Sequence, residues 1–238
     1  MSLPRLRLES CVNENGTWLI DAAQAKHLVK VRRCYNGSLV EGLLNGQKVE
    51  LKLECEAGGE VRAFEVSRCD EAPMTIELHL LLALLKNDQF DDALRFAAET
   101  GVNTIHLLVC ERSVPKVNGK VEEKMARWNK VLAESTKQAG AAMAPQLTEP
   151  VPFNEFSFSS LPKDRYAAIL SPKSVPLKKI NISSQAVVAI GPEGDWSPRE
   201  SESLLDAGFA PVSLGRRILR ASTAVAVACG WFANAGEK

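Results

Sequence analysis

The sequence predicts an α/β protein in two parts, a small and mostly β domain followed by a larger domain built on a parallel sheet. Up to about residue 70 the chain reads as short strands separated by tight turns. Beyond that point, long apolar segments alternate with helical ones, which is typical of a parallel sheet covered on both faces. The stretch Asp70-Glu71-Ala72-Pro73 interrupts the pattern. We therefore place the two domains at residues 1–72 and 73–238.

The first domain is predicted to be a β meander with one short helix. Residues 39–44 and 48–53 flank Asn45-Gly46, a pair suited to the positive φ angles of a tight hairpin turn. Residues 61–66 supply a further strand. Residues 22–33 place their apolar side chains at three-and-four spacing and are expected to be helical.

The second domain is predicted to alternate strands with helices. The apolar segments expected to form its buried strands are residues 76–85, 104–110, 166–170, 186–190 and 212–214. Helices are expected between Asp88 and Gly101, over 121–138, between Ser197 and Gly208, and over 222–235. Asp88 is a candidate N-cap, and Ser197-Pro198-Arg199-Glu200 has the pattern of a capping box with proline at the first helical position.

Composition excludes several classes of protein. With 45% hydrophobic and 24% charged residues, the 238-residue chain has the balance of a globular protein. It has no apolar run of roughly 20 residues, and its first residues lack the pattern of a secretory signal, so we expect no membrane partner and a cytoplasmic location. Six cysteines and three histidines are scattered without any C-x-x-C pair, so no metal site is expected.

Charge is balanced overall but unevenly distributed. Lys and Arg total 29, as do Asp and Glu. Residues 1–35 nevertheless hold six basic against three acidic side chains, and residues 112–137 hold seven against three. Such concentrations suit contact with an anionic polymer, although two solvated faces would give the same counts.

Two motifs follow predicted buried strands, at the sheet edge where α/β proteins bind ligands. The first is Gly191-Pro192-Glu193-Gly194, a preset turn whose backbone can approach a ligand closely. It lacks the pattern of a phosphate-binding loop, which favours a nucleoside without phosphates. The second is Leu214-Gly215-Arg216-Arg217-Ile218-Leu219-Arg220, where arginines beside leucines suit an anion or a nucleobase.

Taken together, these motifs resemble those of the RsmE family, uridine-N3 methyltransferases of small-subunit (16S) ribosomal RNA in the SPOUT superfamily. The resemblance covers almost the whole chain. Further matching segments, in the expected order, are Pro4-Arg5, His27-Leu28 with Val31 and Arg33, Glu99-Thr100-Gly101-Val102, Glu111-Arg112-Ser113-Val114, Arg127-Trp128 and Gln138-Ala139-Gly140.

The resemblance implies a PUA-like RNA-binding barrel followed by a SPOUT domain whose C-terminal segment forms a deep trefoil knot. The knot does not follow from general folding rules, which disfavour threaded loops. S-adenosylmethionine is the implied cofactor, small-subunit ribosomal RNA the implied substrate, and a homodimer the implied assembly. The implied cofactor-binding residues are Leu170, Ile190, Gly191, Pro192, Glu193, Gly194, Leu214, Gly215, Ile218, Leu219 and Thr223.

Chemistry suggests which residues act on the RNA. Methylation at N3 removes a proton from uracil and leaves negative charge on the flanking carbonyl oxygens, which an arginine can stabilise. We assign this catalytic role to Arg220, with Arg112 beside it in the catalytic group and also a candidate RNA contact; no general base stands out. The residues expected to bind RNA are Arg5, Arg7, Lys30, Arg32, Arg33 and Lys86.

Four positions depart from the family pattern. Asp195-Trp196 follows Gly194 where a further glycine is usual, so a carboxylate and an indole could alter the cofactor's fit, or Trp196 could pack beneath the next helix. Ser222 replaces a common glutamate, Ala141-Ala142 replace an arginine, and Phe96 stands where lysine is common. Two alternatives to a 16S ribosomal RNA uridine methyltransferase therefore remain. One is a degenerate SPOUT protein that binds RNA as a ribosome assembly factor, and the other is a SPOUT enzyme with another RNA target.

Overall fold

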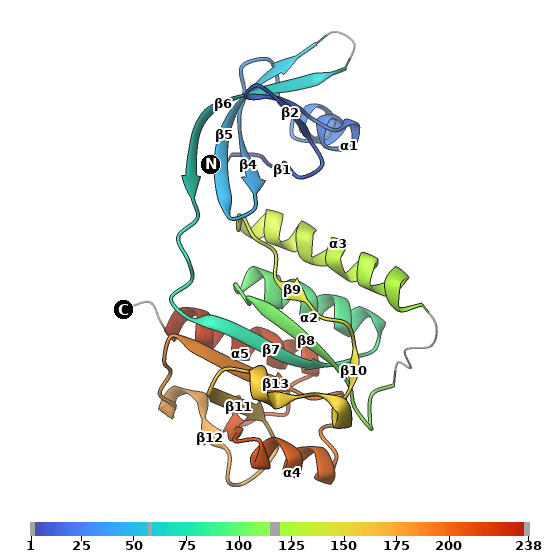
Figure 1. Cartoon of the computed structure of the whole chain (residues 1–238), viewed down its shortest axis with the longest axis vertical. Coiled ribbons are helices and arrows are strands. Elements are labelled where there is room, and N and C mark those ends of the chain that lie inside the picture. The colour runs from blue at the N-terminus through green and yellow to red at the C-terminus, as the bar shows by residue number, and fades with distance from the viewer. Residues whose placement is uncertain (1–2, 57–58, 115–119, 236–238) are drawn as a thin grey trace. The chain divides into compact units, whose positions relative to one another are not determined.

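The computed structural model describes residues 3–56, 59–114 and 120–235. The chain forms two compact units (Figure 1). The first consists of Met1–Pro73 together with Thr136–Met143, and the second of Met74–Ser135 together with Ala144–Lys238. Residues 136–143, which the sequence places within the second domain, thus pack with the first unit.

The first unit contains a six-stranded sheet and a short helix. In spatial order the strands are β1 (Arg5–Arg7), β4 (Leu39–Leu44), β5 (Gln47–Cys55), β6 (Val61–Asp70), β3 (Thr17–Leu19) and β2 (Val12–Glu14). Neighbours are antiparallel except β1 and β4. Alternate strand residues such as Leu6, Val49 and Leu51 point into one core, which Trp18 and Leu28 complete. The predicted hairpin at Asn45-Gly46 is confirmed, with φ of 46° and 83°.

The predicted helix over residues 22–33 has two parts. Asp21 accepts hydrogen bonds from the Ala23 and Gln24 amides and caps α1 (Ala22–Lys26), which continues as a π-helix over His27–Val31. The wider turn ends where the Arg32 amide donates to the His27 carbonyl, and Arg33 then adopts a positive φ of 58°. Single π turns are often found at functional sites.

Arg5 ties residues 136–143 to the first unit. Its Nε donates to Glu41 Oε2 at 2.7 Å, and its Nη1 donates to the Gln138 carbonyl at 2.8 Å. Gly140, at φ +81°, leaves room for this contact, because a Cβ there would lie 2.5 Å from Arg5 Nη2. A side chain predicted to bind RNA is therefore engaged in holding the chain together.

The second unit contains an eight-stranded sheet in which every pairing is parallel. The strands along the sheet are β10 (Val151–Pro152), β8 (Thr104–Val109), β7 (Glu77–Ala83), β13 (Gln185–Ile190), β11 (Asp164–Ala168), β14 (Ala210–Ser213) and β12 (Val175–Pro176), with β9 (Gln146–Leu147) also paired to β8. The predicted α/β class with a parallel sheet is confirmed.

The α-helices among the described residues of this part of the chain are α2 (Asn87–Glu99), α3 (Val121–Ala139), α4 (Pro198–Asp206) and α5 (Ala221–Ala235). The predicted capping box of α4 is present, with Ser197 and Glu200 exchanging side-chain-to-backbone hydrogen bonds. The prediction that Asp88 caps α2 was wrong. The N-cap is Lys86, and Asp88 lies in the first turn, where its negative charge favours the helix dipole.

The strands of the second unit alternate their side chains between two apolar layers. Leu80 and Leu82 of β7 face α2 and α5, whereas Leu81 and Ala83 face a cluster that includes Phe153 and Trp196. A sheet covered on both faces explains why β7 reads as a nearly continuous run of leucine. Within the described residues, no helix has the length and apolar character needed to cross a bilayer.

Two histidines meet near the start of neighbouring strands. His79 Nδ1 and His106 Nε2 lie 3.0 Å apart, and the rings stack with centroids 5.3 Å apart. Phe156 packs edge-on against His106, while Glu77 reaches His79 Nε2 at 3.3 Å and accepts from Gln185. Burial, and secondarily the positive charge of a protonated His79, lowers the pKa of His106 to about 4. The lowered pKa keeps His106 neutral near pH 7.

This pair makes stability depend on pH in a defined direction. The pKa of His106 is lower in the folded chain than the ordinary value of 6.5, so the unfolded chain binds more protons between these values and stability falls as pH falls from 6.5 towards 4. We expect acidification from pH 6.5 to 4.5 to lower the unfolding temperature by roughly 5 °C more in the wild type than in His106→Gln. His27→Gln, at an exposed histidine of the first unit, is the control and should retain the full pH dependence in calorimetry. Equal pH dependence in all three proteins would contradict the assignment.

Candidate functional site

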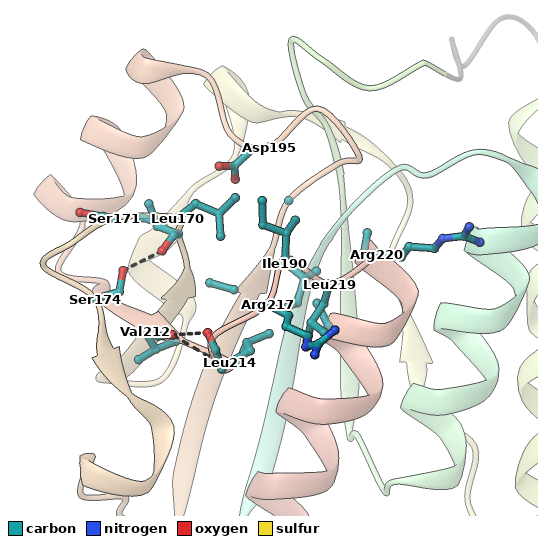
Figure 2. Close-up of a pocket in the computed structure, with 18 of the residues that line it drawn as sticks. Leu170, Ser171, Ser174, Ile190, Asp195, Val212, Leu214, Arg217, Leu219 and Arg220 are labelled. Carbon is teal, nitrogen blue, oxygen red and sulfur yellow. Dashed lines mark hydrogen bonds between the residues drawn. The ribbon is translucent and has the colours of Figure 1, made fainter.

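Three loops meet at the carboxyl edge of the parallel sheet in the second unit. Strands β13, β11 and β14 are consecutive parallel neighbours, so the segments that leave them emerge side by side. Most residues of 168–174, 190–195 and 212–221 in these segments, together with Gln89 of α2 and Ala224 of α5, line a cavity of about 680 Å³ (Figure 2). That volume lies in the range of small-molecule and cofactor sites.

The cavity brings together most of the residues predicted to bind a cofactor. Those that line it are Leu170, Ile190, Gly191, Pro192, Glu193, Leu214, Gly215, Ile218 and Leu219. Gly194 and Thr223 are not among the lining residues. Thr223 is exposed on α5, whereas its helical neighbours Ala221 and Ala224 face the cavity. Helical periodicity thus turns the threonine away.

Trp196 packs against the glycine-proline turn and supports it. Its indole is 3% exposed, donates from Nε1 to the Ala168 carbonyl at 3.1 Å, and packs against Phe153. Gly191 passes directly over this ring, and a Cβ there would lie 3.0 Å from it. Of the two placements open for Trp196, the structure therefore has the buried one, and the indole is not among the cavity-lining residues.

Two further contacts fix the ends of this turn. Glu193 Oε1 accepts from the Lys86 amide at 2.9 Å, which joins the turn to the start of α2. Glu200 is only 5% exposed and accepts from the Ser197 amide and the Glu111 amide, each at 2.8 Å. Burial, followed by the charge of Glu200, raises the pKa of the neighbouring Cys110 thiol, which keeps that thiol protonated and chemically inert.

Arg112 also grips the turn rather than facing the cavity. Its Nη1 donates to the Gly194 carbonyl at 2.8 Å and to the Trp196 carbonyl at 3.3 Å. Its alkyl stem lies against Gly194, where an added Cβ would come within 3.2 Å. The sequence places Arg112 in the catalytic group, whereas its contacts are those of a positioning residue.

Three arginines follow β14, and two of them lie on one side of the cavity. Arg217 and Arg220 line it, Arg216 does not, and all three side chains are exposed. Figure 2 shows the Arg220 guanidinium directed away from Leu170 and Asp195, on the outer side of the pocket. Among the described residues, none forms a hydrogen bond or ion pair with the Arg220 side chain, so the guanidinium can meet a ligand.

The cavity is electrically asymmetric. Its walls carry four charged residues, of which Glu193 and Asp195 come from the turn after β13, and Arg217 and Arg220 from the segment after β14. Most other lining side chains are apolar or small. The described residues contain no group of three or more His, Cys, Asp or Glu that could hold a metal ion.

Some of the residues predicted to bind RNA pair with an acidic side chain, and the others are free cations, with no such partner in the described part of the chain. Arg5 is held by Glu41, and Arg7 donates two hydrogen bonds to Glu9. In contrast, Lys30, Arg32 and Arg33 are exposed at the end of the π-helix. In the second unit, Lys86 has an exposed side chain beside the turn that its amide holds.

Sequence reasoning missed an aromatic side chain beside the free cations. Tyr35 follows Arg33 by two residues and is 74% exposed. The Tyr35 amide donates to Ser38 Oγ at 2.9 Å and the Ser38 amide donates to the Tyr35 carbonyl, so the backbone at this position is fixed. The available signal was the order of the sequence, in which two arginines precede a tyrosine and an Asn-Gly pair.

Comparison with known proteins extends this description. A sequence model of the RNA methyltransferase domain family matches residues 71–233. A protein of Synechocystis sp. named ribosomal RNA small subunit methyltransferase E is 32% identical over 221 residues, covering 90% of this chain and 71% of its own. One from Borreliella burgdorferi named ribosomal RNA small subunit methyltransferase E 2 is 28% identical, covering 94% and 93%.

Solved structures share the fold. A methyltransferase of Legionella pneumophila, solved with the cofactor SAM, superposes with a TM-score of 0.86 at 22% identity over 99% of this chain and 98% of its own. A ribosomal RNA small subunit methyltransferase E of Neisseria gonorrhoeae, solved with S-adenosyl methionine, gives 0.82 at 22% identity over 95% of both chains. From the family match and the relative at 32% identity, the chain belongs to the RNA methyltransferase family that includes the ribosomal RNA small subunit methyltransferases E.

Proposed function

We propose that this protein transfers a methyl group from S-adenosylmethionine to N3 of a uridine in small-subunit (16S) ribosomal RNA. The observation that carries the proposal is the cavity at the carboxyl edge of β11, β13 and β14, where the glycine-proline turn and the arginine-rich segment meet. Relatives named ribosomal RNA small subunit methyltransferase E support the choice of RNA.

The lining residues fit this cofactor. Leu170, Ile190 and Leu214 offer apolar surfaces for an adenine ring, while Gly191 and Gly215 line the same cavity without side chains, so that its polar edge would meet backbone groups there. The site has no phosphate-binding loop, in keeping with a nucleoside without phosphates. S-adenosylmethionine, when bound, supplies an electrophilic methyl group carried on a sulfonium.

Arg220 is the residue we assign to charge stabilisation. Its guanidinium is exposed at the mouth of the cavity and has no partner among the described residues, so it can donate to a uracil carbonyl oxygen as N3 loses its proton. Arg217 lies on the same side and adds positive charge where an RNA phosphate would approach. Arg112 holds the turn that forms the opposite wall.

We further propose that the first unit is a PUA-like barrel that binds RNA, with residues 1–72 as the RNA-binding domain and 73–238 as the methyltransferase domain. Lys30, Arg32 and Arg33 would contact phosphates, and Tyr35 would stack on an unpaired base. The positive φ of Arg33 supports a functional constraint, because non-glycine residues adopt this conformation at a cost.

The assembly and topology complete the proposal. After β14 the chain returns past β11 to pack α5 against α2, β7 and β13, which supports a C-terminal segment threaded into a trefoil knot. Val227 and Ile218 leave apolar surface exposed in the same segment, which supports a homodimer. A ribosomal RNA substrate would place the protein in the cytoplasm.

The direct test uses small ribosomal subunits from a strain that lacks this protein. Incubation with labelled cofactor should transfer label to 16S RNA, and mass spectrometry of the nucleosides should find 3-methyluridine. Binding of RNA without methyl transfer would instead support an assembly factor. Label on another nucleotide or RNA would support a SPOUT enzyme with a different target.

Arg220→Ala should lower kcat in this assay by about 10²–10³-fold, because one donor to the developing negative charge is lost. Its unfolding temperature should match the wild type, since the side chain is exposed. Arg216→Ala is the matched control, because Arg216 is a neighbouring exposed arginine that does not line the cavity. Undiminished turnover by the Arg220 variant would remove this residue from the mechanism.

Arg112→Ala should separate binding from chemistry. Loss of the hydrogen bonds to Gly194 and Trp196 should loosen the turn and raise the Kd for the cofactor about fivefold to tenfold, while kcat at saturating cofactor stays within about twofold. Calorimetry and steady-state kinetics measure the two effects, with Arg199→Ala on the exposed face of α4 as control. A large fall in kcat at unchanged Kd would return Arg112 to the catalytic group.

Substitutions in the first unit should distinguish phosphate contacts from stacking. Replacing Arg32 or Arg33 by Ala should weaken RNA binding and reduce the slope of log K against log salt by about one per contact. Tyr35→Ala should cost about 1–3 kcal/mol of binding with an unchanged slope. Arg62→Ala, at a β6 residue paired with Glu60, is the control. Wild-type affinity in all the loop variants would remove this surface from RNA binding.

A further inference from the structure

Asp195 stands at a position where the backbone conformation favours glycine. The residue follows β13 in the glycine-proline turn, and its φ is +61°. Side chains seldom adopt this conformation, although aspartate and asparagine tolerate it better than most. The Asp195 amide donates to the Pro192 carbonyl at 2.9 Å, and Asp195 Oδ1 accepts from the Trp196 amide at 2.9 Å. The strained conformation is thus held from both sides.

This conformation presents the carboxylate to the cavity. Asp195 is one of the lining residues, and Figure 2 shows its carboxylate turned towards the side where Leu170 lies. Oδ1 is occupied by the Trp196 amide, whereas Oδ2 forms no hydrogen bond with any described residue. One carboxylate oxygen is therefore available to whatever occupies the cavity.

The carboxylate also lacks a neutralising cation. In the part of the chain that the structure describes, no Lys or Arg forms an ion pair with Asp195. Arg217 and Arg220 belong to the other wall, and Figure 2 shows both away from Asp195. Glu193, the other acidic lining residue, is engaged by the Lys86 amide. Arg112 donates to the Gly194 and Trp196 carbonyls on either side of Asp195, but it forms no ion pair with the Asp195 carboxylate. Asp195 and Glu193 therefore place two carboxylates on this wall of the cavity.

A negative potential distinguishes the cofactor from the product of the reaction. Transfer of the methyl group to uracil N3, with release of the N3 proton, converts a sulfonium cation into a neutral thioether. The adenosine, ammonium and carboxylate groups are the same in both molecules, so their contacts contribute equally. A carboxylate in the wall of a partly solvated cavity should favour the cation over the neutral thioether by about threefold to tenfold.

We propose that Asp195 is a specificity-determining residue which makes this pocket prefer S-adenosylmethionine over S-adenosylhomocysteine and so eases release of the product. The inference rests on the proposed function, because it takes the occupant of the cavity to be this cofactor. Glycine at this position would allow the same positive φ without the charge.

The test is calorimetry of the full chain with each ligand alone, without RNA. Asp195→Asn is the matched variant, since it keeps the size, the acceptor for the Trp196 amide and tolerance of positive φ. It should weaken binding of S-adenosylmethionine and of sinefungin, whose amine is also cationic, about threefold to tenfold, while binding of S-adenosylhomocysteine changes less than twofold. Asp195→Gly should behave in the same way. Because glycine adopts a positive φ without strain, this variant is expected to fold.

Salt provides a second measurement. Raising KCl from about 50 to 500 mM should reduce the wild-type preference for the cationic ligands and leave that of Asp195→Asn nearly constant, because salt screens exposed charges. Equal weakening of all three ligands, or no change in any, would overturn the proposal. If the wild type binds none of them, the proposed function fails together with this inference. Binding with the expected preference but no methylation of small-subunit RNA would overturn only the proposed function.

Discussion

The parallel pairing of β13 between β7 and β11 is the constraint on which the site depends. Parallel strands carry their carboxyl ends to the same edge, so the segments after β11, β13 and β14 must emerge together although up to about fifty residues separate them. Both faces of this sheet are covered by apolar layers, which fixes the register of each strand. The position of the cavity is therefore set by the buried parallel sheet.

The glycine-proline turn itself is held by contacts from distant elements. Glu193 reaches the Lys86 amide, Trp196 reaches the Ala168 carbonyl, and Arg112 reaches the Gly194 and Trp196 carbonyls. Each contact comes from a different part of the chain, and each uses a backbone group on one side. Such a turn can keep a fixed shape while most of its cavity-facing surface remains backbone and small side chains, which suits recognition of a rigid nucleoside.

Local signals in the sequence were sufficient wherever the partner lies close along the chain. The capping box at Ser197 and Glu200 involves residues three apart, and the turn at Asn45-Gly46 depends only on its own φ angles. The buried strands can also be predicted from the sequence, because a strand covered on both faces is made almost entirely of apolar residues. These features accounted for the class of the fold and the position of the cavity.

Long-range partners decided the positions where sequence reasoning failed. The sequence did not show that Lys86 rather than Asp88 is the N-cap of α2. The Lys86 amide donates a hydrogen bond to Glu193, which lies 107 residues away. The partners of Arg5 and Arg112 lie 133 and 82 residues away, so their engagement with carbonyl groups had no local signal. Thr223 lies on the exposed side of α5, beside the helical positions that face the cavity, and this orientation is known only from how the helix packs.

The zero net charge of the chain conceals how its cations are used. Many arginines are neutralised by a nearby carboxylate, as in the pairs Arg5–Glu41, Arg7–Glu9, Arg62–Glu60, Arg68–Glu65, Arg95–Asp92 and Arg127–Asp91. Among the described residues, Arg32 and Arg33 in the first unit, and Arg217 and Arg220 in the second, have no such partner. Exposed paired charges contribute little to long-range attraction, so each unpaired arginine adds more than a paired one to the field that an RNA meets. Asp195 carries the opposite charge on another wall of the cavity, so the side that would receive a polyanion and the side that would receive a sulfonium cation differ in the sign of their charge.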